Sequence, residues 1–271
     1  LAFLGAISYN DPLAQSIFVL NINNGKSKLV TPDFKESFVD VEWIDDQTVI
    51  GLSQRGTKTV LSTIFLTENL PEEVFNQNDV LAPKQIISSF SFHKYTKQLV
   101  ITANSNQHPN ELYVGLYNSK KMKRITFLNA SLADIQLSKQ ETISWKARDG
   151  KTIEGVLTYP LVYRDGKRYP LILQIHGGPE GVSLDGWNTR VTYPVQLLAA
   201  NGYFVLEPNY RGSAGRGVAY SKLDHDDLGG EEFNDVLKGI DYLIKKGFVD
   251  KNQVGTGGWS YGGYFSALAA T

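Results

Sequence analysis

The chain has 271 residues, of which 42% are hydrophobic and 20% are charged, and its formal net charge is −1. This composition is typical of a globular protein long enough for two domains, and the near-neutral charge gives no reason to expect nucleic acid or an anionic membrane as a partner. The chain has no cysteine, which excludes disulfides and thiolate metal sites, and no apolar run approaches the roughly 18 residues of a membrane span.

The first seven residues read as a strand. They have no basic start and no cleavage site, so they do not resemble a signal peptide. The chain also lacks an initiator methionine, and only 11 residues follow Ser260. We therefore expect this sequence to be part of a longer protein, with a cytoplasmic location as the default.

Residues 1–135 contain short β-rich runs and no convincing helix pattern. The runs form pairs at residues 3–7 and 16–20, 48–52 and 60–64, and 99–103 and 112–116. The pairs recur every 45 to 51 residues, which is the period of a four-stranded propeller blade. We predict that residues 1–135 are the C-terminal blades of an incomplete β-propeller, with an irregular sandwich as the alternative.

Residues 136–271 show β/α alternation. The expected elements are a hairpin with strands 142–146 and 152–157, a buried strand at 171–175, a helix at 194–200 and a strand at 203–206. An amphipathic helix is expected to begin with Glu231 and Glu232 and to end with Lys245-Lys246-Gly247. Such alternation predicts a mostly parallel sheet covered by helices. We therefore predict that residues 136–271 are the N-terminal part of an α/β-hydrolase domain, truncated after the motif described next.

Gly258-Trp259-Ser260-Tyr261-Gly262 lies between an expected strand at 253–257 and a small, apolar helix at 264–270. This is the G-x-S-x-G nucleophile elbow in its strand–turn–helix context. A serine hydroxyl attacks well only when it is held out where a base reaches it, and the tight turn leaves no room for a Cβ two residues before or after it. We predict that Ser260 is a nucleophile; the alternative is a glycine-rich turn with an idle serine.

Acyl transfer by serine also needs an oxyanion hole. One donor is normally the backbone N–H after the nucleophile, here Tyr261, and the other comes from the loop after an earlier strand. His176-Gly177-Gly178-Pro179 follows the strand at 171–175 and fits that loop, unless it is an ordinary turn.

Three motifs together resemble the prolyl oligopeptidase family of serine peptidases. They are His176-Gly177-Gly178-Pro179, Asn209-Tyr210-Arg211-Gly212-Ser213 with Gly215 and Gly217, and Gly258-Trp259-Ser260-Tyr261-Gly262-Gly263-Tyr264. A histidine at 176 is more similar to the acylaminoacyl-peptidase and bacterial dipeptidyl-peptidase branch, since other branches have a tyrosine there. The resemblance implies a propeller followed by an α/β-hydrolase domain, and oxyanion donors at the N–H groups of Gly178 and Tyr261. It also implies that His176 and Gly177 shape the oxyanion loop.

In this fold the triad runs Ser, Asp, His along the chain, so the resemblance places the acid and the base after Ser260. The four histidines, at 93, 108, 176 and 225, all precede it. His225, next to Asp224, looks like a triad pair but lies at the wrong place in the topology. We expect the chain by itself to be catalytically incomplete.

Four acidic residues and one arginine have less specific interpretations. Glu72 and Glu73 resemble the paired glutamates that hold a substrate amino terminus in dipeptidyl peptidases, although their context favours a surface turn. For Arg211 we expect a structural ion pair, with positioning of the substrate or of a loop near the site as the alternative. Asp235 and Asp241 are expected on the polar side of their helix, either solvated or hydrogen-bonded to a neighbouring loop.

The predicted function is hydrolysis of short peptides through an acyl-enzyme on Ser260, without any cofactor, metal, nucleic acid or membrane. The alternatives are an esterase with the same fold, and a non-catalytic propeller or pseudoenzyme that only binds. The sequence does not predict an oligomeric state.

Overall fold

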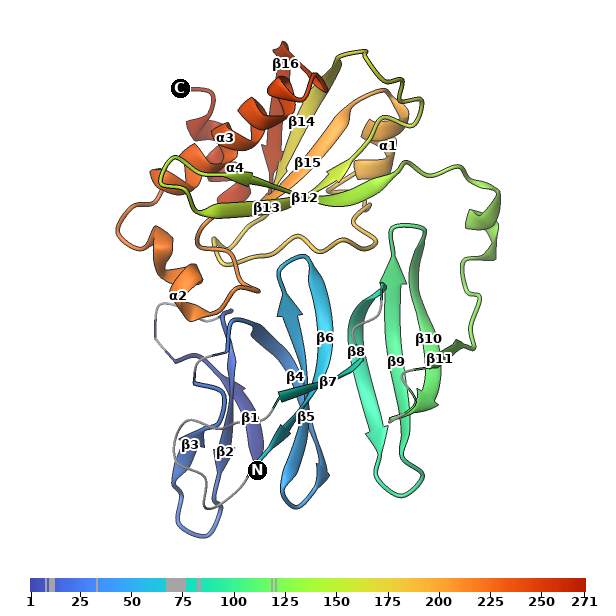
Figure 1. The fold of residues 1–271 in the computed structure, drawn as a ribbon, viewed down its shortest axis with the longest axis vertical. Helices are drawn as coiled ribbons and strands as arrows, with labels where there is room; N and C mark the ends of the chain where they lie inside the picture. The colour runs from blue at the N-terminus through green and yellow to red at the C-terminus, as the bar shows by residue number, and fades with distance from the viewer. Residues whose placement is uncertain are drawn as a thin grey trace. The chain divides into compact units, whose positions relative to one another are not determined.

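The computed structural model describes residues 1–7, 9, 13–32, 34–66, 77–81, 84–117, 119 and 121–271. The chain divides into two compact units (Figure 1). Unit 1 consists of Leu1–Ala130 and Ala214–Val218, and unit 2 consists of Ser131–Ser213 and Ala219–Thr271. The division at residues 130–131 lies a few residues before the boundary expected at 135–136, and the return of residues 214–218 to unit 1 has no counterpart in the sequence pattern.

Unit 1 contains three antiparallel sheets within its described residues, with strand orders β1-β2-β3, β4-β5-β6-β7 and β11-β10-β9-β8. The strands are β1 (Ala2–Gly5), β2 (Ser16–Leu20), β3 (Ser27–Leu29), β4 (Ser37–Asp45), β5 (Thr48–Arg55), β6 (Lys58–Phe65), β7 (Gln77–Leu81), β8 (Ile86–His93), β9 (Gln98–Ser105), β10 (His108–Leu116) and β11 (Met122–Arg124). The 3₁₀ helix η1 (Ala130–Asp134) follows the last of them.

The three expected strand pairs are confirmed as β1–β2, β5–β6 and β9–β10, all antiparallel. The sequence pattern missed the other strands of these sheets. β3 and β11 have only three residues each, and β4 carries two acidic residues between its apolar ones and a third at its end. Two sheets have the four strands of a blade, but none of the sheets in the described part closes on itself, so the propeller stays a prediction.

The apolar core of unit 1 explains why the middle strands were the easiest to recognise. Leu52, Leu61, Leu99 and Ile101, from β5, β6 and β9, lie in one buried cluster. Burial of an apolar side chain is worth about 1.5–3 kcal/mol, and the middle strands carry most of these residues.

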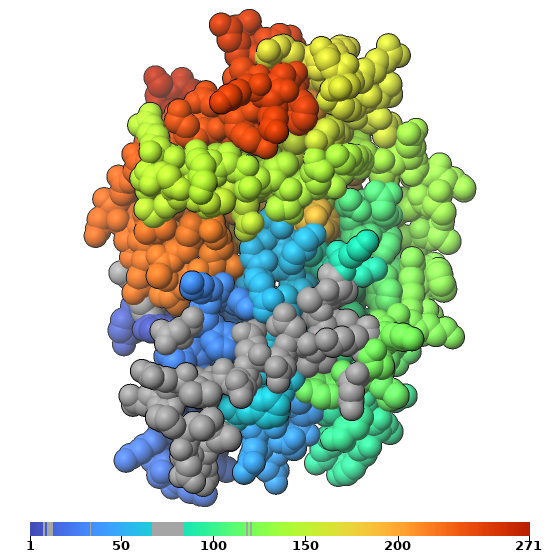
Figure 2. Space-filling model, in the orientation of Figure 1, coloured from blue at the N-terminus to red at the C-terminus, as the bar shows by residue number. Residues whose placement is uncertain are grey.

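Unit 2 is built on a five-stranded sheet with the order β12-β13-β15-β14-β16. The strands are β12 (Gln140–Lys146), β13 (Thr152–Thr158), β14 (Tyr169–Ile175), β15 (Phe204–Asn209) and β16 (Val249–Gly258). The expected hairpin is confirmed as β12–β13, which forms a continuous band of side chains on the face drawn in Figure 2.

The prediction of a mostly parallel sheet is only half right. β14 pairs in parallel with β15 and β16, as expected. β12–β13 is antiparallel, because the short turn at residues 147–151 reverses the chain without the crossover that a parallel pair needs. β13–β15 is antiparallel as well.

The helices of unit 2 are α1 (Val195–Ala200), α3 (Glu231–Lys245) and α4 (Tyr261–Leu268), and the short α2 (Val218–Ser221) is followed by the 3₁₀ helix η2 (Lys222–Asp224). The bounds of α3 agree with the expected helix. α3 contacts β12 and β16, α4 contacts β14 and β16, and α1 contacts β13 and β15. Val236 of α3 and Phe265 of α4 pack into the buried apolar cluster of the sheet. Among the described residues, no helix combines the length and the apolarity that crossing a membrane requires.

Candidate functional site

Ser260 occupies a strained turn between β16 and α4. Its φ is 55° and its ψ is −119°, in a region where a residue with a side chain costs about 1–3 kcal/mol. Such a conformation persists only when neighbouring structure holds it. The residue is exposed, so the hydroxyl is presented outward at the end of a strand.

The two glycines of the elbow are explained by the end of β14. A Cβ on Gly258 would lie 2.5 Å from the carbonyl oxygen of Ile175, and one on Gly262 would lie 2.2 Å from the same atom. Both distances are below any van der Waals contact. This confirms the expectation that the turn has no room for a Cβ at these two positions, because the turn packs directly against the end of β14.

The loop 176–179 begins where β14 ends, and it lies directly against the elbow. A Cβ on Gly177 would lie 3.2 Å from the Cβ of Ser260 and 3.8 Å from its Oγ. Gly178 has φ +131°, and a Cβ there would lie 2.2 Å from the nitrogen of Glu180, so only glycine fits. The structure thus brings together the predicted nucleophile and the predicted oxyanion loop from positions more than 80 residues apart in the sequence.

Tyr261 is the first residue of α4. The first backbone N–H groups of a helix have no partner inside the helix, and the helix dipole makes this end positive. The N–H of Tyr261 is therefore chemically suited to a developing negative charge. Its role as an oxyanion donor, like that of Gly178, stays a prediction.

His176 has both ring nitrogens engaged. Nδ1 lies 2.9 Å from the carbonyl oxygen of Gly177, and Nε2 lies 3.0 Å from Oγ of Ser213. Burial of the ring lowers the pKa of His176 to about 4, against the opposing effect of the Gly177 carbonyl, so the ring is neutral near pH 7. With both nitrogens occupied, His176 holds its loop and is not free to act as a base for Ser260.

Two tyrosine hydroxyls, which the sequence analysis did not consider, make hydrogen bonds at the elbow. The Tyr193 hydroxyl accepts a hydrogen bond from the N–H of Trp259 at 3.0 Å and lies 3.4 Å from the carbonyl oxygen of Ile175. The Tyr261 hydroxyl donates to Oε1 of Glu232 at 2.7 Å. Burial, together with that bond, raises the pKa of Tyr261. Neither contact has a local sequence signal, because each joins distant segments.

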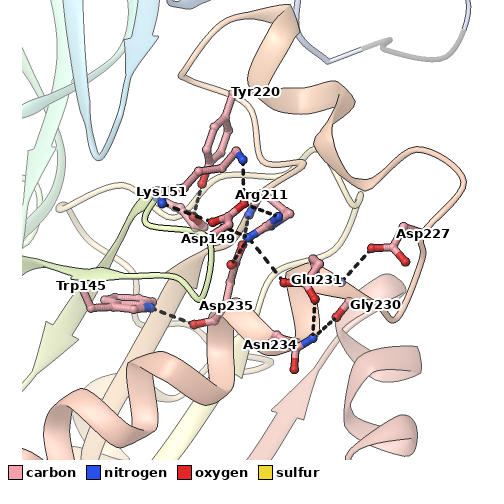
Figure 3. A network of polar contacts seen from close by, with 11 residues as sticks. Trp145, Asp149, Lys151, Arg211, Tyr220, Asp227, Gly230, Glu231, Asn234 and Asp235 are labelled. Atoms are coloured by element: carbon pink, nitrogen blue, oxygen red, sulfur yellow. Dashed lines mark hydrogen bonds and ion pairs between the residues drawn. The ribbon is translucent and has the colours of Figure 1, made fainter.

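Figure 3 shows the polar network around Arg211. Its guanidinium donates to both carboxylate oxygens of Asp235, from Nε at 2.9 Å and from Nη2 at 2.7 Å. Nη1 reaches Asp149, in the β12–β13 turn, at 3.2 Å. The expected structural ion pair is confirmed, and it fastens the segment after β15 to α3.

The two aspartates fulfil the expectation in different ways: Asp235 is hydrogen-bonded to the segment after β15, and Asp241 is solvated. Asp235 is fully buried, because the bidentate contact with Arg211 compensates its charge. Asp241 is exposed and pairs with Lys238 at 2.9 Å. Helical spacing cannot separate these two aspartates, since their difference lies in a residue of another segment.

The other histidines and acidic candidates belong to other segments of the chain. His93 and His108 belong to unit 1, at the end of β8 and the start of β10. Asp224, beside His225, is packed against Gly212, and burial raises the pKa of Asp224 to about 6. Glu72 and Glu73 lie outside the described residues. Across the part of the chain that is described, no group of three or more acidic, histidine or cysteine side chains is arranged to hold a metal ion.

An α/β unit with a serine in a strand–turn–helix elbow, beside a glycine-rich loop from the adjacent strand, defines a site of the serine-hydrolase class. Residues 189–271 match the model of the prolyl oligopeptidase family. This part of the chain therefore belongs to this family of peptidases.

Two of the curated proteins similar to this chain are named as peptidases. The chain is 31% identical over 185 residues to a protein named uncharacterized peptidase YuxL from Bacillus subtilis, a match that covers 68% of this chain and 27% of the relative. It is 27% identical over 255 residues to dipeptidyl-peptidase 5 of Porphyromonas gingivalis, and this match covers 92% of this chain and 35% of that protein. The chain therefore spans about a third of the length of these relatives.

The fold is similar to that of solved acylaminoacyl peptidases. One, in complex with Z-Gly-Gly-Phe-chloromethyl ketone, matches with a TM-score of 0.80 and 21% identity, covering 99% of this chain and 40% of that chain. The Pyrococcus horikoshii acylaminoacyl peptidase matches with a TM-score of 0.79 and 20% identity, covering 98% of this chain and 40% of that chain. At these identities the likeness concerns the fold.

Proposed function

We propose that the complete protein is a serine peptidase that hydrolyses short peptides through an acyl-enzyme on Ser260. The observation that carries the proposal is the apposition of Gly177 and Ser260, with 3.8 Å between a Cβ position on the glycine and the serine Oγ. A substrate carbonyl attacked by this hydroxyl lies next to the glycine loop. Membership in a peptidase family supports an amide as the bond that is cleaved.

The proposed chemistry has two steps. Oγ of Ser260 bonds to the carbonyl carbon, its proton passes through a base to the leaving amine, and the C–N bond breaks. Water then hydrolyses the ester and restores the hydroxyl. The N–H groups of Gly178 and Tyr261 stabilise the oxyanion in both steps, and loss of one such donor typically costs about 10²–10³ in rate. The acid and base are assigned to positions after Ser260, as the family resemblance implies.

Within this proposal, unit 1 is the last part of a β-propeller and unit 2 is the front of an α/β-hydrolase domain. The two four-stranded antiparallel sheets of unit 1 and the elbow-bearing sheet of unit 2 support this interpretation. A propeller limits access to small substrates, by analogy with the family. We propose short peptides as substrates and a cytoplasmic location.

The test uses the complete natural protein. Ser260→Ala is expected to abolish peptide and ester hydrolysis and labelling by a fluorophosphonate, because no other group replaces the attacking oxygen. Ser144→Ala, at an exposed serine on β12, is the control and retains both. Hydrolysis or labelling that survives in Ser260→Ala refutes the proposal.

An esterase with the same elbow is the second candidate, because the geometry of Ser260 suits ester and amide alike. A panel of N-acylated aminoacyl anilides, dipeptidyl anilides with a free amino terminus, and simple acyl esters separates the two. Cleavage of the anilides identifies a peptidase, and their relative rates separate the acylaminoacyl and dipeptidyl types. Absence of both activities in the complete protein favours the non-catalytic alternative.

A further inference from the structure

The carbonyl of Gly177 is held from two sides. Its oxygen lies 2.9 Å from Nδ1 of His176 and accepts a hydrogen bond from the N–H of Gly181 at 3.1 Å. In a trans peptide the C=O and the next N–H point in opposite directions. Anchoring the Gly177 oxygen therefore sets the direction of the N–H of Gly178, the group that we propose as an oxyanion donor.

This anchor works in only one tautomer of His176. A carbonyl oxygen can only accept, so Nδ1 must carry the proton, and in the neutral ring Nε2 is then bare. The hydroxyl of Ser213, 3.0 Å from Nε2, donates to it. In the opposite tautomer, a lone pair on Nδ1 would face the carbonyl oxygen of Gly177. Ser213 is fully buried, so its hydroxyl is shielded from bulk water.

Tyr210 fixes the plane of the same ring. Its side chain is fully buried and stacks on His176 with 4.5 Å between ring centroids and 19° between planes. Its hydroxyl lies 3.3 Å from Nδ1 of His176 and, with the Nδ1 proton directed at Gly177, donates to the carbonyl oxygen of His176 at 3.2 Å, which also orients the peptide before Gly177. The other side of the Tyr210 ring packs on Phe265 of α4, at 5.7 Å between centroids.

We propose that Ser213 and Tyr210 are positioning residues that act through His176: Ser213 selects its Nδ1–H tautomer, Tyr210 holds its ring, and together they aim the N–H of Gly178. The inference rests on the proposed function, because the N–H matters only if an oxyanion forms beside Ser260. Neither residue touches the reacting atoms. Their substitution should therefore lower the rate of the chemical step and leave substrate binding nearly unchanged.

The kinetic test compares three variants of the complete protein. Ser213→Ala removes the donor to Nε2, and Tyr210→Phe keeps the stacking and removes only the hydroxyl. Ser138→Ala is the matched control, since it removes a buried hydroxyl of unit 2 that has no hydrogen-bond partner among the described residues. We expect kcat to fall about 10- to 100-fold in the first two, with KM within about twofold, because loss of a whole oxyanion donor costs 10²–10³.

A spectroscopic test does not depend on activity. In ¹⁵N-histidine-labelled protein, the imidazole nitrogens of His176 are expected to show a protonated Nδ1 and a bare Nε2, and Ser213→Ala is expected to shift protonation toward Nε2. His176→Asn identifies the signal.

Two results would overturn the inference: a protonated Nε2 in the unmodified protein, or Ser213→Ala and Tyr210→Phe kinetics equal to those of Ser138→Ala. Failure of the proposed function is separate, since it shows as activity that persists in Ser260→Ala.

Discussion

Replacing Asp235 with alanine is expected to destabilise unit 2 strongly. The Asp235 carboxylate is fully buried and accepts three hydrogen bonds from Arg211: from Nε at 2.9 Å, from Nη2 at 2.7 Å and from the backbone N–H at 3.0 Å. The substitution removes all three acceptor contacts and leaves the guanidinium, which is only 5% exposed, with half of its partners.

The size of the expected loss of stability follows from the positive charge of Arg211, which stays buried when Asp235 is removed. Removing one partner of a buried ion pair costs about 3–5 kcal/mol, because the other charge is left without compensation. Asp149 still contacts Arg211, at 3.2 and 3.4 Å, through a side chain that is 35% exposed. This second carboxylate places the expected loss near the lower limit, about 3 kcal/mol of the free energy of unfolding.

Denaturant unfolding followed by tryptophan fluorescence measures this loss. Trp145 is a suitable reporter, because its indole N–H donates to the backbone oxygen of Asp235 at 2.8 Å. The transition midpoint should fall while the denaturant slope stays constant. Asp241→Ala, on the same helix, removes an exposed pair with Lys238 and should cost no more than about 1 kcal/mol.

The reasoning is refuted if Asp235→Ala costs no more than Asp241→Ala. A second variant checks the physical cause. Arg211→Met with Asp235→Leu removes both charges together, and it should recover much of the stability that Asp235→Ala loses, because no uncompensated charge stays buried. A double variant as unstable as the single one would indicate lost packing rather than lost charge compensation.

Two further outcomes are expected. Gly262→Ala should lower the melting temperature, because its Cβ would lie 2.2 Å from the carbonyl oxygen of Ile175. Gly263→Ala is the control: its Cβ would lie 3.6 Å from the nearest atom, the Gly258 oxygen, so the change should be neutral or slightly stabilising. Equal effects of the two variants would contradict the elbow packing. Burial raises the pKa of Glu207 from 4.5 to about 7. At pH values between 4.5 and about 7 the folded state therefore binds more protons than the unfolded state, and the free energy of unfolding should fall as the pH rises through this range. Glu207→Gln should flatten this part of the stability–pH curve, and an unchanged curve would exclude Glu207 as its source.

Much of the local structure followed from the sequence alone. The bounds of α3 and the β12–β13 hairpin agree with the pattern, because helical periodicity and turn residues act over a few neighbours. The elbow glycines were likewise recognisable, since a strained turn tolerates few residue types. Strands without a clear apolar pattern, such as β3 and β11, escaped recognition, because pairing with a neighbouring strand rather than their own composition defines them.

The sequence alone predicts a serine in a nucleophile elbow and a glycine loop after an earlier strand. Only the tertiary structure placed Gly177 against Ser260, buried Asp235 on Arg211 and set Ser213 beside His176. The physical reason is the range of the forces involved. Dihedral preferences and periodicity act within one turn or strand, whereas burial and the compensation of buried polar groups depend on which distant segments meet.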